Sequence, residues 1–265
     1  MNILDQLAEH ARERVAIAQQ AIPLEQVREA ALARSEMTKV SAFAFEKALS
    51  KKNDIAFICE CKKASPSKGL IAPDFPYLQI AKEYEAAGAD AISVLTEPKW
   101  FLGADKYLEE IASEVTIPCL RKDFTVDPYM IYEAKNLGAS AILLIMSILS
   151  EKKAAEYLEL ADSLGMSALV ETHNEAEVTA ALNIGARIIG VNNRNLKDFS
   201  VDTENSRRLR EKIPSGVLFV SESGVSSPED VARLREIGAD AVLVGETLMR
   251  AEDKKKRLLE LSGRA

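Results

Sequence analysis

A short pattern recurs five times along this chain: a helical segment ends at a glycine, and an apolar strand follows at once. The five segments are residues 86–95, 136–145, 163–171, 183–191 and 236–244. Glycine suits the end of a helix because it adopts left-handed backbone with no Cβ in the way. The strands are nearly continuous apolar runs, as in parallel sheets with both faces covered. The pattern therefore predicts an α/β fold built from repeated helix–strand units.

Three more apolar segments complete the series. Residues 54–62 precede the first of the five units, and residues 117–124 and 216–225 follow connections that contain proline. Eight strands separated by helices, at a spacing of roughly 20–30 residues, are typical of a (β/α)8 barrel, the TIM barrel. A doubly wound open sheet is the alternative, but eight regular units without a second domain favour closure.

Several of the intervening helices have identifiable starts. Asp127 and Ser227 each stand directly before a proline, and Ser150 stands before EKKAAEYLELADSLG. Ser and Asp cap helix N-termini, and proline fits the first turn. We expect residues 1–265 to form a single barrel domain, of which about 1–50 is an N-terminal helical extension.

The charge balance bears on the class of partner. Lys and Arg total 34 against 41 Asp and Glu, which gives a net charge of −7. A chain without a basic excess is poorly suited to nucleic acid, although a local basic pocket for a small anion is compatible with it. The sequence contains no run of about 18 apolar residues, which is the length needed to span a bilayer. The first residues, MNILDQLAEHARERVA, predict an amphipathic helix with acids, not a signal peptide.

The cysteines and histidines point to neither disulfides nor metal. Cys59, Cys61 and Cys119 all fall in predicted strands, and an odd count gives no disulfide framework. We interpret them as buried thiols in a reducing cytoplasm. His10 and His173 belong to different regions, so no metal-ligand spacing is present.

Polar side chains end several of the predicted strands. In the segment DIAFICECKK, alternation places Ile58, Glu60 and Lys62 on one face, opposite Cys59 and Cys61. The same alternation in four other strands leads from apolar residues to Lys122, Glu171, Asn192 followed by Arg194, and Glu222. A single such end is typical of a solvated strand terminus or a core ion pair. Five ends converge on one mouth in a barrel, where active sites lie, so together they indicate acid–base catalysis.

Two further features predict a phosphate site. Ser223 and Gly224 follow the seventh strand, and Gly245 follows the eighth, where barrels often bind phosphate through backbone N–H groups. The alternative is that these glycines only turn the chain. The connection 63–76, KASPSKGLIAPDFP, is long for such a fold. It predicts either a lid or a static loop stiffened by proline.

Six motifs, in order along the chain, carry a resemblance. They are ECKKASPSKG, LRKDF, ALVETH, IGVNNRNL, VSESGV and VGETLMR. With the opening ILDQLAEHARERV, they resemble indole-3-glycerol-phosphate synthase of tryptophan biosynthesis over essentially the whole chain. No isomerase domain follows the last motif, so the resemblance is to the monofunctional form.

The resemblance implies an activity. The family closes the ring of 1-(2-carboxyphenylamino)-1-deoxyribulose 5-phosphate, with loss of CO₂ and water, to give indole-3-glycerol phosphate. It implies no metal and no organic cofactor. By this resemblance Lys122 is the general acid at the substrate carbonyl, and Glu171 is the acid/base that assists loss of the hydroxyl. Glu60 and Lys62 match the pair on the first strand, and Asn192 and Glu222 match groups that position substrate hydroxyls and charge.

The resemblance also implies a set of binding residues. Arg194 matches a residue on the anthranilate side, and Ser65, Gly224, Gly245 and Glu246 fall around the phosphate. The family often has Ser where this chain has Glu246, so only the backbone N–H of Glu246 is carried over.

The residues themselves are compatible with this chemistry. A substrate with one phosphate and one carboxylate needs cationic partners, which Lys62, Lys122 and Arg194 supply. Phe101 and Phe124 are candidates for holding the anthranilate ring, with core packing as the alternative. The sequence leaves open whether Lys62 and Lys122 share or exchange their roles.

Two rival functions fit the same fold. A sugar-phosphate isomerase needs fewer charged groups than the two Lys and three Glu found here, and a non-catalytic phosphometabolite-binding barrel predicts loss of Lys62, Lys122 or Glu171. The sequence thus favours the synthase, acting in the cytoplasm on a small phosphorylated substrate. It does not determine the oligomeric state, for which a monomer is favoured.

Overall fold

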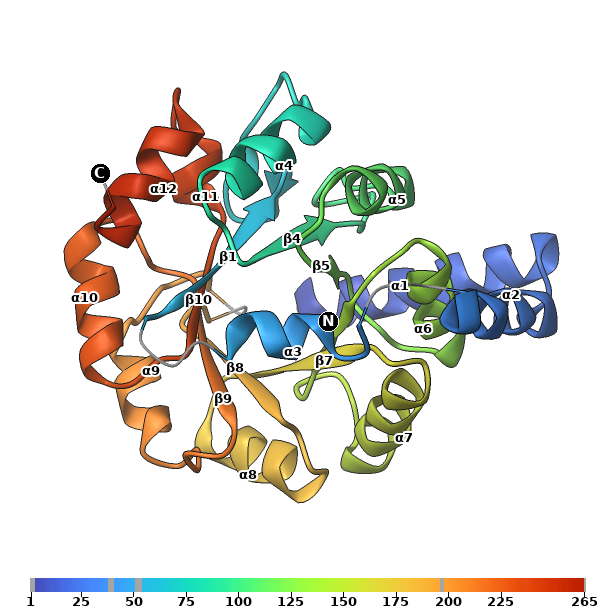
Figure 1. The fold of residues 1–265 in the computed structure, drawn as a ribbon. Coiled ribbons are helices and arrows are strands. Elements are labelled where there is room, and N and C mark those ends of the chain that lie inside the picture. Colours follow the sequence, from blue (N-terminus) through green and yellow to red (C-terminus); the bar gives the residue numbers. More distant parts are fainter. Residues whose placement is uncertain (1–2, 38–40, 51–53, 196–197, 265) are drawn as a thin grey trace.

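Eight parallel strands close into a barrel in the computed structural model, which describes residues 3–37, 41–50, 54–195 and 198–264. Going round the barrel, β1 pairs with β10 on one side and with β4 on the other (Figure 1). The strands are β1 (Ala56–Cys61), β4 (Ala91–Leu95), β5 (Cys119–Lys122), β6 (Ala141–Ile145), β7 (Ser167–Thr172), β8 (Ile188–Asn192), β9 (Leu218–Glu222) and β10 (Ala241–Val244). Closure confirms the predicted (β/α)8 barrel and excludes the open sheet.

Helices that follow the strands along the chain form the outer ring of the barrel (Figure 1). They are α4 (Tyr77–Ala86), α5 (Asp105–Glu114), α6 (Pro128–Asn136), α7 (Glu151–Ser163), α8 (Glu175–Asn183), α9 (Glu204–Arg210), α10 (Pro228–Glu236), the short α11 (Glu246–Met249) and α12 (Lys254–Ser262). The predicted caps are present: the side chains of Asp127, Ser150 and Ser227 each accept a hydrogen bond from a backbone N–H in the first turn. No helix in the described part of the chain is long and apolar enough to cross a membrane.

The five recurring glycines end their helices as predicted. Each adopts positive φ, between 69° and 91°, at residues 88, 138, 165, 185 and 238. An L side chain is strained in that region, so glycine lets the chain leave each helix and enter the next strand directly.

Strand alternation divides the core into two layers. Ile58, Leu120 and Leu169 belong to an inner cluster that fills the barrel, whereas Phe57 and Ile92 pack outward among the helices. The three cysteines lie in the outer layer as free, buried thiols, as predicted. Burial raises the pKa of the Cys119 thiol to about 12. The inward positions therefore continue, beyond the apolar layer, into the mouth of the barrel.

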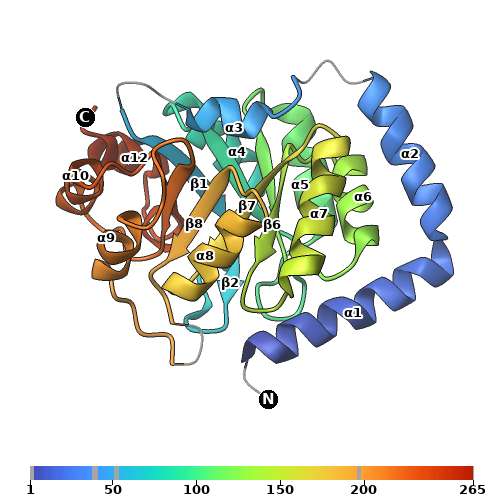
Figure 2. The ribbon, with the colours of Figure 1, turned by 90° about the horizontal axis from the view of Figure 1, so that it is seen from below.

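Two of the three N-terminal helices, the first and the third, lie at opposite ends of the barrel, and the second runs beside it (Figure 2). The three helices are α1 (Ile3–Ala21), α2 (Leu24–Met37) and α3 (Ala44–Leu49). Phe45 and Leu49 of α3 are fully buried and join the inner cluster at the end where the strands begin. Leu7 and Ala11 of α1 join the same cluster at the opposite end, where the strands finish. The helical extension therefore plugs one end and lies across the other.

The connection after β1 carries a small structure of its own. β2 (Ala64–Ser65) and β3 (Gly69–Leu70) pair antiparallel within the segment 63–76, and Ala64 N donates to Phe101 O at 3.2 Å. The segment is thus tied to the next loop of the mouth. Its predicted motion as a lid stays a prediction.

Candidate active site

A cavity of about 390 Å³ opens at the carboxyl ends of the strands. Every site residue predicted from the sequence lines it: Glu60, Lys62, Lys122, Glu171, Asn192, Glu222, Ser65, Phe101, Phe124, Arg194, Ser223, Gly224, Gly245 and Glu246. The structure therefore brings together residues from five barrel strands and from the connections that follow barrel strands. Their individual roles stay predictions.

Glu60 and Lys62 form a close pair at the end of β1. Lys62 Nζ donates to Glu60 Oε1 at 2.6 Å, and Ser93 Oγ donates to the other oxygen at 3.3 Å. Burial by itself would raise the pKa of Glu60, but Lys62 and Lys122 outweigh it and hold that pKa below its usual range. Glu60 is therefore a carboxylate held in one orientation.

Lys122 lies between two acids. Its Nζ is 3.5 Å from Glu171 Oε2 and 3.7 Å from Glu222 Oε2, and all three side chains are largely buried. Burial opposes the charge on Lys122, but Glu171 and then Glu222 raise its pKa above the ordinary value. The side chain is thus an ammonium group inside the cavity.

Glu222 is the central acid whose pKa is raised. Its pKa rises to about 8, first because it is buried and then because Glu171 lies nearby. Its Oε1 has no hydrogen-bond partner among the described residues. At neutral pH Glu222 is therefore mostly neutral, and the charge on Lys122 is balanced chiefly by Glu171. A Cβ on Gly190 would lie 2.1 Å from Glu222 Oε1, so only glycine leaves room for this carboxyl group.

Asn192 links the acids to the end of the mouth that is predicted to bind phosphate. Its Nδ2 donates to Glu171 Oε1 at 3.3 Å, and its Oδ1 accepts from Ser223 Oγ and from the backbone N–H of Arg194, both at 3.0 Å. The Arg194 guanidinium in turn donates to Phe199 O at 3.1 Å. Asn192 thereby fixes the loops after β8 and β9 relative to Glu171.

Backbone glycines shape the end of the cavity predicted to bind phosphate. Gly224 adopts φ +92°, and a Cβ on Gly245 would come within 2.4 Å of Glu60 Oε1. The Glu246 carboxylate accepts from Arg250 Nε at 2.9 Å and lies 3.6 Å from Lys68 Nζ. Burial opposes ionisation of Glu246, but Arg250 and Lys68 hold its pKa below the usual range. A carboxylate therefore stands beside the predicted phosphate position together with two cations.

Two phenylalanines form the apolar wall of the cavity. The rings of Phe101 and Phe124 lie 6.2 Å apart between centroids, and Ile3 and Leu7 of α1 line the cavity with them. The contribution of α1 was not predicted, since nothing in its sequence indicates which face of the barrel it covers.

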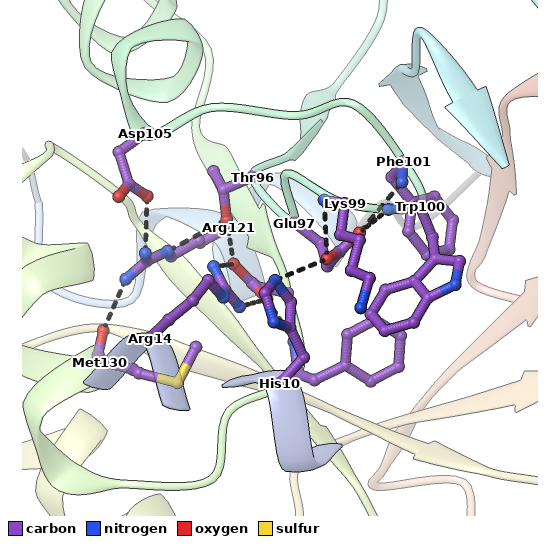
Figure 3. A network of polar contacts seen from close by, with 12 residues as sticks. His10, Arg14, Thr96, Glu97, Lys99, Trp100, Phe101, Asp105, Arg121 and Met130 are labelled. Atoms are coloured by element: carbon purple, nitrogen blue, oxygen red, sulfur yellow. Dashed lines mark hydrogen bonds and ion pairs between the residues drawn. The ribbon is translucent and has the colours of Figure 1, made fainter. Parts of the chain in front are cut away.

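A buried carboxylate shapes the loop that carries Phe101 (Figure 3). Both oxygens of Glu97 accept backbone hydrogen bonds, from Lys99 N at 3.0 Å and from Trp100 N and Phe101 N at 2.8 and 3.0 Å. His10 of α1 packs edge-on against the Trp100 ring. The Phe101 backbone is therefore fixed by a side chain beneath the loop.

A second network ties α1 to the residue that precedes Phe124, and Figure 3 shows Arg14 and Thr96 of this network. Arg14 donates to both oxygens of the fully buried Asp123 carboxylate, at 2.6 and 3.1 Å, and Thr96 Oγ1 donates to it at 2.6 Å. Asp123 Oδ1 also accepts from the backbone N–H of Phe124 at 2.8 Å. Although burial opposes ionisation, Arg14 and Arg121 hold the pKa of Asp123 below its usual range. This ion pair anchors the helix that crosses the mouth.

Comparison with known proteins gives the site its context. A model of the family described as indole-3-glycerol phosphate synthase matches residues 4–261. The chain belongs to the indole-3-glycerol phosphate synthase family. This family assignment confirms the resemblance carried by the six motifs. It excludes the sugar-phosphate isomerase and the non-catalytic binding barrel as readings of this chain.

Relatives within the indole-3-glycerol phosphate synthase family match most of the chain. The synthase of Ruminiclostridium cellulolyticum is 54% identical over 263 residues, which is 99% of this chain and 100% of that protein. The synthase of Lacticaseibacillus casei is 57% identical over 208 residues, 78% of this chain and 80% of that protein.

More distant solved structures share only the barrel. A 3-hexulose-6-phosphate synthase from Salmonella typhimurium superposes with a TM-score of 0.65 at 14% identity, covering 79% of this chain and 97% of that one. A chain of the tryptophan synthase complex from Pyrococcus furiosus has a TM-score of 0.60 at 18% identity, covering 79% and 98%. At such identities the likeness describes the fold.

Some lining residues of this family member were missed from the sequence. Ser226, Thr247 and Arg250 also line the cavity, close in sequence to the glycines predicted to bind phosphate. Arg250 lies four residues after Glu246, one helical turn away, which was the available signal. Within the described ranges no three His, Cys, Asp or Glu side chains form a group that would hold a metal ion.

Proposed function

We propose that this protein is an indole-3-glycerol-phosphate synthase that acts in tryptophan biosynthesis as a decarboxylating carbon–carbon lyase. Its substrate would be 1-(2-carboxyphenylamino)-1-deoxyribulose 5-phosphate. The observation that carries the proposal is the Lys122 ammonium, held within 3.7 Å of both Glu171 and Glu222 in a cavity with an apolar wall and a glycine-lined end.

Substrate binding would use the two ends of the cavity. The phosphate would accept hydrogen bonds from the backbone around Gly224 and Gly245 and from Ser65, with Arg250 and Lys68 nearby as cations. The anthranilate ring would pack against Phe101 and Phe124, and Arg194 would face its carboxylate. Such binding places the aromatic carbon and the ketone carbon next to one another, which reduces the entropic part of the barrier.

Ring closure would use Lys122 as the general acid. Its ammonium group donates a proton to the ketone oxygen while the ring carbon that bears the carboxylate attacks the ketone carbon. The oxygen becomes a hydroxyl group, Lys122 becomes a neutral amine, and loss of neutral CO₂ restores the aromatic ring. A cation at the developing oxyanion is also an electrostatic contribution, since the site is buried.

Loss of the hydroxyl group as water would complete the indole. This step needs an acid at the leaving oxygen and a base for the departing proton, and Glu171 is suited to one of these roles because it is buried and hydrogen-bonded to Asn192. The Lys62–Glu60 pair is the second candidate for acid–base work in this step. We assign ring closure to Lys122 and not to Lys62, because Lys122 lies between the two central acids.

The test is fluorescence-monitored turnover of the carboxyphenylamino-deoxyribulose phosphate by the purified protein. Wild type should form the indole product, and Lys122→Ala should lower kcat by about 10²- to 10⁴-fold while substrate affinity changes little, since the amine acts mainly in the transition state. Lys106→Ala, on the exposed face of α5, is the matched control.

Two outcomes would contradict the proposal. If wild type binds the substrate without forming indole, the assigned activity is wrong. If Lys62→Ala abolishes ring closure while Lys122→Ala retains it, the two lysines exchange roles.

The remaining expectations from the sequence are part of the proposal. We propose one domain over residues 1–265, a cytoplasmic location, a monomeric state, no nucleic-acid partner and no metal or organic cofactor. The net charge of −7 supports the absence of a nucleic-acid partner. Light scattering measures the mass in solution, and activity that persists in a chelator would support cofactor independence.

A further inference from the structure

His173 lies behind Glu171, on the side away from the predicted substrate. It comes two residues after Glu171, one step further along the inward register of β7. Its Nε2 is 3.4 Å from Glu171 Oε1, is buried, and has no hydrogen-bond partner among the described residues. Glu171 therefore faces two cationic or titratable groups, Lys122 at Oε2 and His173 at Oε1.

The other ring nitrogen of His173 contacts Glu177 of α8 and Ser147. Its Nδ1 lies 3.2 Å from Glu177 Oε2 and 3.1 Å from Ser147 Oγ, and Glu177 also accepts from the His173 backbone N–H at 2.8 Å. Asn174 caps α8 and donates to Glu177 at 2.8 Å, which fixes that carboxylate. The result is a chain of four side chains: Lys122, Glu171, His173 and Glu177.

The outer end of this chain opens into a second cavity. This cavity has a volume of about 610 Å³ and is lined by Ser147, His173 and Glu177. Asn192 and Arg194 line both this cavity and the active-site cavity. His173 therefore stands between Glu171 and a separate polar opening to solvent, and a proton could pass this way while substrate fills the main mouth.

The proposed reaction requires such a proton. The substrate carboxylate carries one negative charge and leaves as neutral CO₂, and the water that follows is also neutral. Each turnover therefore takes up one proton from solvent. Lys122 loses its proton to the ketone oxygen during ring closure, and the bound substrate separates it from the main mouth.

We propose that His173 is a proton-transfer residue, which returns a proton through Glu171 to Lys122 once per turnover; this inference rests on the function proposed above. The protonated imidazole gives its Nε2 proton to Glu171, and Glu171 gives a proton to the neutral Lys122 amine. The imidazole keeps its Nδ1 proton, and rotation of the ring brings the vacant Nε2 to water in the second cavity, from which it regains a proton. One proton enters from solvent and one ammonium group is restored, so the charge balances. His173 does not touch the substrate and acts only through Glu171.

The charges around His173 favour the protonated ring. Burial lowers the pKa of His173, but the hydrogen bond to Glu177 and the negative charges of Glu171 and Glu177 raise it above its ordinary value. The wider set of charged groups at this cavity is mixed: Asp5 of α1, Arg194, Asp202 and Arg208 also line it.

The experiment compares His173→Gln with wild type in steady-state turnover. Glutamine keeps a hydrogen-bond donor toward Glu171 but carries no exchangeable acid, so a purely orienting role would survive the change. We expect kcat to fall about tenfold or more, with KM within about twofold. In His173→Ala, added imidazole should restore part of kcat, with no such effect on wild type.

A second pair of variants tests the outer partner. Glu177→Gln removes the carboxylate that contacts Nδ1 and should lower kcat several-fold. Glu175→Gln removes the same charge two residues earlier on α8, where the side chain is exposed and pairs with Lys212, and should leave kcat unchanged. If His173→Gln fails to fold, the comparison of Glu177→Gln with Glu175→Gln still tests the proton-transfer role of His173.

The outcomes separate this inference from the proposed function. If His173→Gln keeps kcat within about twofold, or if His173→Ala loses activity that imidazole does not restore, His173 has no proton-transfer role even though the synthase assignment stands. If wild type forms no indole, the function itself is wrong and the inference loses its premise.

Discussion

Replacing Glu222 by Gln tests the electrostatics of the central acids. The folded protein keeps the Glu222 proton up to about pH 8, whereas an ordinary glutamate loses it near 4.5. Between these values the folded state binds one more proton than the unfolded state, so the free energy of unfolding falls as pH rises. The slope is about 1.4 kcal/mol per pH unit, and over the whole window the contribution is on the order of 5 kcal/mol.

Glu222→Gln removes this dependence because an amide does not titrate. The stability of the variant relative to wild type should therefore increase from pH 5 to pH 8 and level off above it, by at most on the order of 5 kcal/mol. Urea unfolding followed by circular dichroism at pH 5, 6.5, 8 and 9 measures the difference. Glu175→Gln controls for loss of a surface charge. A difference that stays constant over this range would mean that Glu222 is already ionised at neutral pH, and our account of the charge on Lys122 would be wrong.

Three other changes have defined consequences. Gly190→Ala places a methyl group 2.1 Å from Glu222 Oε1, so we expect kcat to fall at least tenfold; Gly216→Ala has open space around it and no positive φ, and serves as a folding control for the thermal melt. Arg14→Met leaves the Asp123 carboxylate buried without its main partner, which should cost about 3 kcal/mol in urea unfolding. Glu246→Gln removes the negative charge beside the predicted phosphate position, so KM should fall several-fold with kcat unchanged, as steady-state kinetics would show; a raised KM would contradict the placement.

Much of the barrel could be predicted because its signals are local. A glycine after a helix, a Ser or Asp before a proline, and a continuous apolar run each depend on a few neighbouring residues. Once closure is assumed, the inward alternation from Ile58 to Glu60, or from Leu169 to Glu171, converts sequence position into a place in the mouth. The predicted cluster of acids and lysines was found in this way.

The parts that were missed depend on long-range packing. The path of α1 across the mouth follows from its ion pair with Asp123, more than a hundred residues away in sequence, and no local pattern records it. His173 is different, since the alternation that led from Asn192 to Arg194 leads equally from Glu171 to His173. The sequence therefore contains this signal, although the spacing of the two histidines bears only on metal binding.

The plug at the base of the barrel has a consequence for biosynthesis. Phe43 N, at the start of α3, donates to Gly165 O, and Glu46 of α3 pairs with Arg187. The surface on which α3 packs is therefore complete only after β7 and β8 have been synthesised. About 115 residues separate the end of α3 from Gly165, and a ribosome adds them in roughly 6 to 23 s. During that interval Phe45 and Leu49 lack the part of their packing surface that β7 supplies. An apolar segment near the start of the nascent chain must therefore wait for the middle of the barrel, and a chaperone that shields it would act during this interval.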